Sequence, residues 1–169
     1  MCRGTRGIAV AVVGILAFSP GVQAQAVSDS MLVSVDRFSL FADCSPVMPF
    51  VSVDTSHRLM GGELGWEMLQ GLAEYKLRVA GLFDLSRAHE AVSLVIRVEL
   101  LDGAYSASVE FSKRLYDAIS DERGSASTWT LAVPGIHEND LSRVLLSVSL
   151  LLDRFVANYL RINGSACDS

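Results

Sequence analysis

Two alternating runs joined by a tight turn constrain the fold of this chain more than any other feature. From Ala91 to Leu100 every second residue is apolar, and the alternation returns from Tyr105 to Phe111. Asp102-Gly103 lies between the runs, and this dipeptide favours the two-residue turn of a β-hairpin. One side of the hairpin is apolar and the other polar, which predicts an antiparallel sheet with one covered face.

Two segments before the hairpin also have strand-like patterns. Leu32–Phe41 (LVSVDRFSLF) is predicted to be the first strand, with a bulge near Arg37 where the alternation changes parity. Val47–Asp54 (VMPFVSVD) is predicted to be a short extended segment. Pro49 would restrict that segment to an edge of the sheet, because proline cannot donate to a strand ladder.

Beyond the hairpin, a polar stretch and a further apolar alternation follow. Asp117–Ser127 (DAISDERGSAS) is predicted to be an exposed loop. Thr128–Val133 (TWTLAV) is predicted to return as a strand that Pro134-Gly135 ends.

Two segments have the spacing of amphipathic helices. The first is predicted over Glu63–Leu82, with a left-handed turn at Gly81. The last helix is predicted to start at a cap formed by Asn139 or Asp140. A coiled-coil partner is the alternative interpretation of its long apolar stripe. The apolar positions are Trp66, Leu69, Ala73, Leu77 and Ala80 in the first helix, and Leu141, Leu145, Val148, Leu152, Phe155, Tyr159 and Ile162 in the last.

Together these elements predict an α+β fold. We expect a two-layer sandwich in which two helices pack on one face of a mainly antiparallel sheet. Residues 27–169 have the length of a single domain.

The N-terminus has the order of a secretory signal. Two arginines precede an apolar run of about a dozen residues, which is too short to cross a bilayer. Small residues then offer cleavage after Ala24 or Ala26, so residues 1–26 are predicted to be a cleavable signal peptide. An uncleaved N-terminal anchor is the alternative. Cleavage removes two arginines and no acid, which moves the formal charge from −5 to −7. An acidic chain without a basic stripe is a poor candidate for binding nucleic acid or anionic lipid.

Two cysteines remain after cleavage, Cys44 and Cys167. In the periplasm or outside the cell, an even pair predicts a disulfide. Two free thiols or an intermolecular bridge are the alternatives. No cysteine follows the apolar run closely, so we expect no lipid anchor and no integral membrane segment in the exported protein.

Several stretches of the chain resemble a family of small exported bacterial proteins. They are Ala73–Phe83, Ser108–Phe111, Ser127–Trp129, Leu152–Phe155 and Tyr159–Asn163. This resemblance implies export but no activity. The order of helix and sheet is also similar to the α+β domain of the TolB N-terminus and of the curli-secretion lipoprotein. That second resemblance implies a role in protein contact or assembly, although the lipid-anchor cysteine is missing.

Candidate functional residues are few. Tyr105 and Trp129 are predicted either to pack in the core or to form a contact patch for a partner, together with His137. His137-Glu138-Asn139-Asp140 is the densest group of polar ligand types, but its spacing matches no metal site. Asn163-Gly164-Ser165 is a formal glycosylation sequon. The sequence predicts no catalytic residue, metal or cofactor.

The leading interpretation is a non-enzymatic periplasmic or secreted protein that contacts another envelope protein. The first alternative is a carrier that binds a small ligand between helix and sheet. The second is a hydrolase that uses His137 with acidic partners.

Overall fold

The structure is a computed structural model that describes residues 29–55, 65–138 and 140–167, and only the backbone of 29–34 and 55. The predicted signal peptide, the start of the predicted first helix and the candidate cap Asn139 lie outside the described residues. The elements follow in the order α1 (Asp29–Leu40), β1 (Val47–Thr55), α2 (Trp66–Val79), the 3-10 helix η1 (Leu85–Glu90), β2 (Val92–Leu100), β3 (Ala104–Asp117), β4 (Glu122–Ile136) and α3 (Leu141–Cys167).

The strands form one sheet in the order β1-β2-β3-β4. β1 runs parallel to β2, and the other two pairs are antiparallel, so the predicted mainly antiparallel sheet is confirmed. The predicted hairpin joins β2 to β3, where Leu101 and Ala104 exchange backbone hydrogen bonds and Gly103 adopts a φ of 73°. β1 lies at an edge, as Pro49 predicts.

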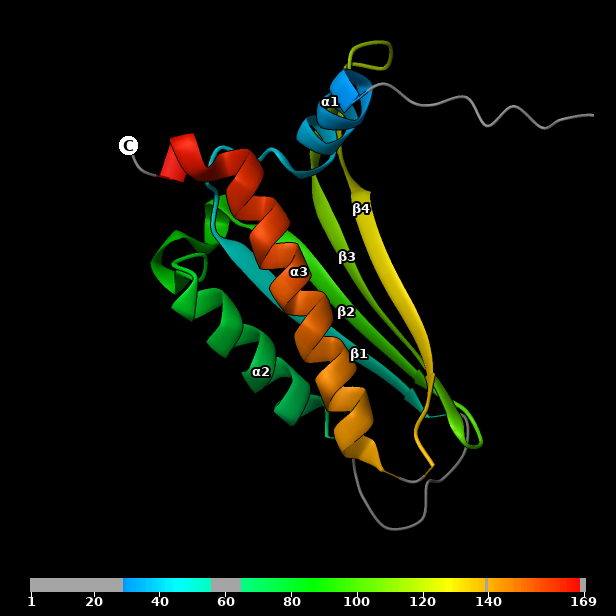
Figure 1. The fold of residues 1–169 in the computed structure, drawn as a ribbon. Helices are drawn as coiled ribbons and strands as arrows, with labels where there is room; N and C mark the ends of the chain where they lie inside the picture. Colours follow the sequence, from blue (N-terminus) through cyan, green and yellow to red (C-terminus); the bar gives the residue numbers. More distant parts are fainter. Residues whose placement is uncertain (1–28, 56–64, 139, 168–169) are drawn as a thin grey trace, which may run out of the picture.

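Two helices cover one face of this sheet, as the sequence predicts. Figure 1 shows α2 and α3 side by side over the strands. α2 buries Leu69, Ala73 and Leu77, whereas Trp66, which the pattern also placed on the apolar face, is exposed. In α3 the side chain of Asp140 caps the helix by accepting a hydrogen bond from the Ser142 N–H (3.0 Å). The α3 side chains buried in the core or against α1 are Val144, Val148, Leu151, Leu152, Phe155, Tyr159 and Asn163. None of the helices in the described ranges is long and apolar enough to span a membrane.

The first predicted strand is wrong, because Asp29–Leu40 forms helix α1. Short apolar runs fit a helix as well as a strand, and tertiary contacts decide between the two. α1 packs at one end of the sandwich against α3 and the end of the β3–β4 pair (Figure 1). Asp36 pairs with Arg161 of α3 (2.7 Å), and Lys113 of β3 donates to the carbonyls of Phe38 and Phe41 at the C-terminal end of α1. The expected bulge at Arg37 therefore does not exist.

The C-terminal end of α3 is fastened to the segment after α1. Cys44 and Cys167 form the predicted disulfide, with Cα atoms 5.0 Å apart. Asn163 is fully buried: its side chain accepts a hydrogen bond from the Ala42 N–H (2.8 Å) and donates to the Leu40 carbonyl (3.0 Å). Because it is a structural link, its sequon is not accessible for glycosylation in the folded chain.

The predicted loop over 117–127 is largely wrong. β3 and β4 continue beyond the N-terminal end of β2 as a two-stranded ribbon, and only four residues, 118–121, connect them. The real bulge lies in β4 at Thr128, between the pairs Phe111–Trp129 and Ser112–Ser127. Its hydroxyl donates to the Ser39 carbonyl (2.6 Å), so the bulge also anchors α1.

One hydrogen bond establishes which groups of β4 bond to β3. The His137 N–H donates to the Gly103 carbonyl (3.1 Å), immediately beyond the last paired residues. Hydrogen-bonded pairs alternate along an antiparallel ladder. Over the regular part of β4 after the bulge, the odd-numbered residues therefore bond to β3, with Leu131 opposite Val109 as one such pair. The even-numbered residues point their backbone groups to the open edge.

This alternation explains why Pro134-Gly135 does not end the strand, as the sequence suggested. Pro134 occupies a position that faces outward, so its missing N–H costs the sheet no hydrogen bond. Gly135 is required for a different reason. A Cβ atom at this position would overlap the ring of Tyr105, which lies across the strand. β4 therefore continues to Ile136.

Candidate functional site

The three residues predicted for partner contact lie in the interior rather than on a common exposed patch. Tyr105 is buried, and its hydroxyl lies 2.6 Å from Oγ of Ser147 on α3. Trp129 is half-buried, with its ring centroid 5.6 Å from that of Phe155. His137 is fully buried, with Nε2 3.0 Å from the Leu101 carbonyl oxygen. Tyr105 and His137 hold the ends of β3 and β4 in place, and we place the candidate site on the surface beside them.

That surface begins with the open edge of β4. Within the described chain, β4 pairs with β3 only, so its other side is an unpaired strand edge. The backbone groups of Thr130 and Ala132 and the carbonyl of Pro134 point outward there. No charge interrupts residues 128–133, and such an edge is a ready template for another extended segment.

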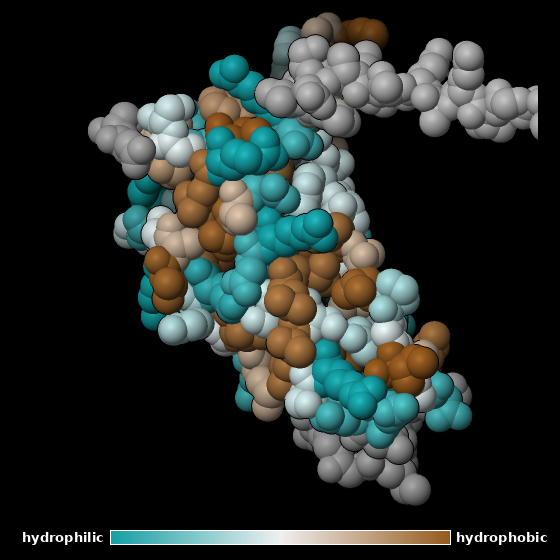
Figure 2. All heavy atoms as spheres, in the orientation of Figure 1, coloured by the Kyte–Doolittle hydropathy of each residue, from teal (hydrophilic) through white to brown (hydrophobic). Residues whose placement is uncertain are grey.

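An apolar groove of about 430 Å³ runs along this edge between β4 and α3. Leu131 and Val133 form its strand wall, and Leu150 and Leu151 form its helix wall. Leu150 is 59% exposed although it is a large apolar residue in a helix. Figure 2 shows hydrophobic atoms along the outer side of α3 that continue toward β4. The full lining is Leu131, Ala132, Val133, Ser147, Leu150, Leu151 and Arg154.

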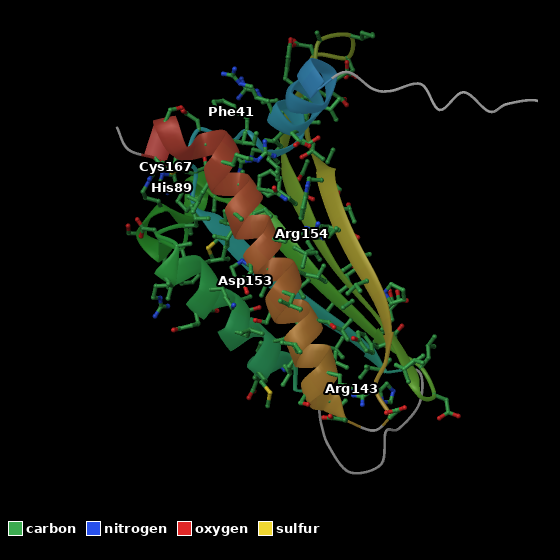
Figure 3. The ribbon with its side chains drawn as sticks, in the orientation of Figure 1. Phe41, His89, Arg143, Asp153, Arg154 and Cys167 are labelled. Atoms are coloured by element: carbon green, nitrogen blue, oxygen red, sulfur yellow. A yellow bond between two sulfur atoms is a disulfide. The ribbon has the colours of Figure 1, made fainter. Side chains whose placement is uncertain are left out.

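Arg154 is the one charged residue of the groove lining. Its neighbour Asp153 lies on the α2 side of α3 and binds Lys76 (2.6 Å), whereas Arg154 lies on the β4 side (Figure 3). Nearly all basic side chains in the described ranges have an ion pair, a hydrogen bond or an aromatic ring as partner. The three without any are Arg154, Arg114 and Arg123. The groove therefore combines apolar walls with one guanidinium group, that of Arg154, which has no partner among the described residues.

The opposite edge of the sheet is less open. β1 carries Pro49, and the side-chain amide of Gln70 on α2 donates to the Pro49 carbonyl (3.1 Å). Proline and a covering side chain are two of the devices by which proteins block strand edges. β4 has neither over residues 128–133, and its own outward-facing proline, Pro134, lies beyond that stretch. The structure therefore favours residues 128–133 of β4 as the edge that binds a partner.

Nothing in the described residues forms a recognisable catalytic or metal centre. No group of three or more His, Cys, Asp or Glu side chains is arranged there to hold a metal ion. In the polar cluster around His137, Glu138 pairs with Arg143 (3.0 Å), and hydrogen bonds from Ser142 to Asp140 lower the pKa of that carboxyl. Burial raises the pKa of Tyr159, whose hydroxyl donates to the Ser45 carbonyl (2.9 Å). Both perturbed groups have structural partners.

The residues of the groove were not predicted from the sequence, although one signal was present. Leu146 and Leu150 are four residues apart in α3 but lie off the apolar stripe that faces the core. A helix that packs only on a sheet does not need a second apolar pair. Such a pair indicates a further contact surface.

Comparisons with known proteins assign the chain to no family. No protein-family model matches it, and no curated protein is similar to it in sequence. A solved structure of a PelC dodecamer from Paraburkholderia phytofirmans is 19% identical, over 72% of this chain and 91% of that chain, with a TM-score of 0.37. This is a loose similarity of fold.

Proposed function

We propose that this chain is an exported, non-enzymatic contact module that takes up an extended segment of another envelope protein at the edge formed by β4 and α3. The observation that carries the proposal is the open β4 edge beside an apolar groove. Export rests on the signal-like N-terminus, and the Cys44–Cys167 disulfide supports an oxidising compartment.

In this function, the partner segment adds a fifth strand to the sheet. Its backbone pairs with the outward groups of Thr130 and Ala132, about 4.8 Å from β4. Because strand side chains alternate, every second partner side chain enters the groove beside Leu150. The segment therefore has apolar residues at alternate positions.

The charge of the groove further defines the partner. Arg154 has no partner among the described residues and lines the groove at its helix wall. A carboxylate of the partner segment would complete a charge-assisted pair, since guanidinium groups bind carboxylates in a bidentate manner. We therefore expect an apolar segment that carries an aspartate or glutamate, and a basic segment is disfavoured.

Photo-cross-linking in the producing cell tests this proposal. A benzophenone amino acid replaces Leu150 in the groove and, as the control, Tyr75, which is similarly exposed (64%) but lies on α2. We expect a protein adduct from position 150 that is absent from position 75 and is lost with Ala132→Pro, which removes an outward N–H. No adduct at position 150, or one that Ala132→Pro leaves unchanged, would contradict strand addition.

A small-ligand carrier is the second candidate, because the groove volume lies within the range of ligand pockets. Leu150→Glu and Ala132→Pro separate the two functions. A small apolar ligand found by native mass spectrometry would be displaced by Leu150→Glu and unaffected by Ala132→Pro. The fully buried ring of His137 lies outside the groove lining and gives the hydrolase interpretation no support.

A further inference from the structure

The ribbon formed by the end of β3 and the start of β4 has one face covered by α1 and one face open. Its strands are Ser112–Asp117 and Glu122–Ser127. Lys113 points to α1, where its ammonium lies 4.9 Å from the ring centre of Phe38. Since side chains alternate between the faces of a strand, Arg114 and Tyr116 belong to the opposite, open face.

The strand register brings two arginines together on that open face. Arg114 lies opposite Ser125, and Tyr116 lies opposite Arg123, so the two arginines are diagonal neighbours. Long side chains at such positions reach one another. They line a concavity of about 800 Å³, whose lining residues are Arg114, Leu115, Tyr116, Asp121, Arg123, Gly124 and Ser125.

Neither guanidinium has a partner in the part of the chain that the structure describes. Two of the three ribbon carboxylates, Asp117 and Asp121, accept hydrogen bonds within the hairpin, and the third, Glu122, lies opposite Asp117 on the face of Lys113. Asp121 accepts a hydrogen bond from the Tyr116 hydroxyl (2.7 Å), which raises the pKa of that phenol. Asp117 accepts hydrogen bonds from the Ile119 N–H (2.9 Å) and the Ser120 hydroxyl (3.0 Å). Two guanidinium groups held close together, neither of which forms an ion pair in the described residues, favour the binding of an oxyanion.

The tip of the same ribbon carries the most exposed large apolar side chain in the described residues. Ile119 is 98% exposed, at the centre of the turn. The neighbouring Tyr116 is also exposed and combines an apolar ring with a polar hydroxyl. An apolar tip beside cationic side chains is the arrangement of a segment that enters the interface of a membrane.

We propose that the end of the β3–β4 ribbon binds an anionic membrane surface. Arg114 and Arg123 bind the phosphate of a lipid headgroup, and Ile119 enters the boundary of the acyl layer. This site is independent of the groove between β4 and α3. It also revises the expectation from net charge, because strand pairing places Arg123, which lies within the predicted loop, beside Arg114.

Co-sedimentation of the processed chain with vesicles tests the proposal. Vesicles of phosphatidylcholine are compared with vesicles of phosphatidylcholine and phosphatidylglycerol in equal parts. We expect binding only to the anionic vesicles, weakening as salt is raised. The double variant Arg114→Gln with Arg123→Gln should bind about 25- to 30-fold more weakly, since each arginine near an anionic surface contributes about a fivefold factor.

Two further variants complete the test. Ile119→Ser should weaken binding severalfold without altering the arginine pair. Arg97→Gln is the matched control: Arg97 is an exposed arginine on the same face of the sheet, but Glu110 pairs with it (3.3 Å), so binding should be unchanged.

Equal binding to both vesicle types, or no binding, would overturn the proposal. So would a double variant that behaves like Arg97→Gln. Inorganic phosphate is titrated in parallel and followed by NMR. Shifts at Arg114 and Arg123 without vesicle binding would assign the concavity to a free anion and overturn the lipid assignment.

Discussion

Proline substitution at two neighbouring positions of β4 tests the register on which the proposed strand addition depends. The Leu131 N–H faces β3 and bonds to the carbonyl of Val109, whereas the Ala132 N–H faces the open edge. Leu131→Pro therefore breaks a ladder hydrogen bond and Ala132→Pro does not. Two residues further on, Pro134 already occupies an outward-facing position of the same strand.

The structure sets the size of the contrast. Leu131→Pro leaves the carbonyl of the fully buried Val109 unpaired, at a cost of about 1–3 kcal/mol. The lost packing of the half-buried Leu131 side chain adds about 1 kcal/mol. Ala132→Pro alters an exposed side chain and an outward N–H, and we expect a change of at most about 1 kcal/mol. The two variants should differ by about 1–4 kcal/mol in the free energy of unfolding.

Urea denaturation of both variants, followed by circular dichroism, measures this difference. Equal destabilisation would contradict the assigned register. A larger loss for Ala132→Pro would show that the register is shifted by one residue. The outward groups would then be those of the odd-numbered positions, and the strand addition described above would fail with them.

The remaining predictions concern the hydrogen bonds of Asn163, the packing of Gly135, the titration of Tyr159 and the disulfide. Asn163→Ala leaves buried backbone groups unpaired and should lower the free energy of unfolding by about 2–5 kcal/mol in urea titration. Gly135→Ala should cost about 1–3 kcal/mol because the Tyr105 ring must move, and Gly135→Ala combined with Tyr105→Leu should recover part of that loss. Burial raises the pKa of Tyr159 in the folded chain above its value in the unfolded chain. The contribution of this group to the free energy of unfolding is therefore complete below pH 10 and is lost as the pH rises above 10. Tyr159→Phe should flatten this loss of stability at alkaline pH. Reduction of Cys44–Cys167, which closes a separation of 123 residues, should cost about 4–5 kcal/mol, and an intact mass of the exported protein equal to that of the reduced chain would contradict the bridge.

The sequence predicts the elements whose periodicity is long and regular. The β2–β3 hairpin, the edge strand with Pro49, and the stripes of α2 and α3 follow from apolar spacing over many residues. The Cys44–Cys167 bridge follows from the count of cysteines in an exported chain. A long apolar period is compatible with one type of secondary structure only, and two cysteines allow only one pairing within the chain.

The wrong predictions share a physical cause, since each depends on contacts between residues far apart in sequence. Lys113 and Asn163 bind carbonyls at the C-terminal end of α1, and the residues of α1 alone give no sign of either contact. Asp117–Ser127 looks like a loop because its residues are polar, yet the β3 register extends through it. The candidate groove is hidden for the same reason: Leu150 and Arg154 lie on α3, and only the fold places them beside β4.

Amide hydrogen exchange detects strand addition at β4, with the protein alone and bound to a synthetic copy of the partner segment that is cross-linked from position 150. We expect the amides of Thr130 and Ala132, which have no strand partner in the free protein, to become protected in the complex. Leu131 and Val133, which already bond to β3, should change little. If Thr130 and Ala132 exchange as fast in the complex as in the free protein, no strand is added at β4 and the proposed function is wrong.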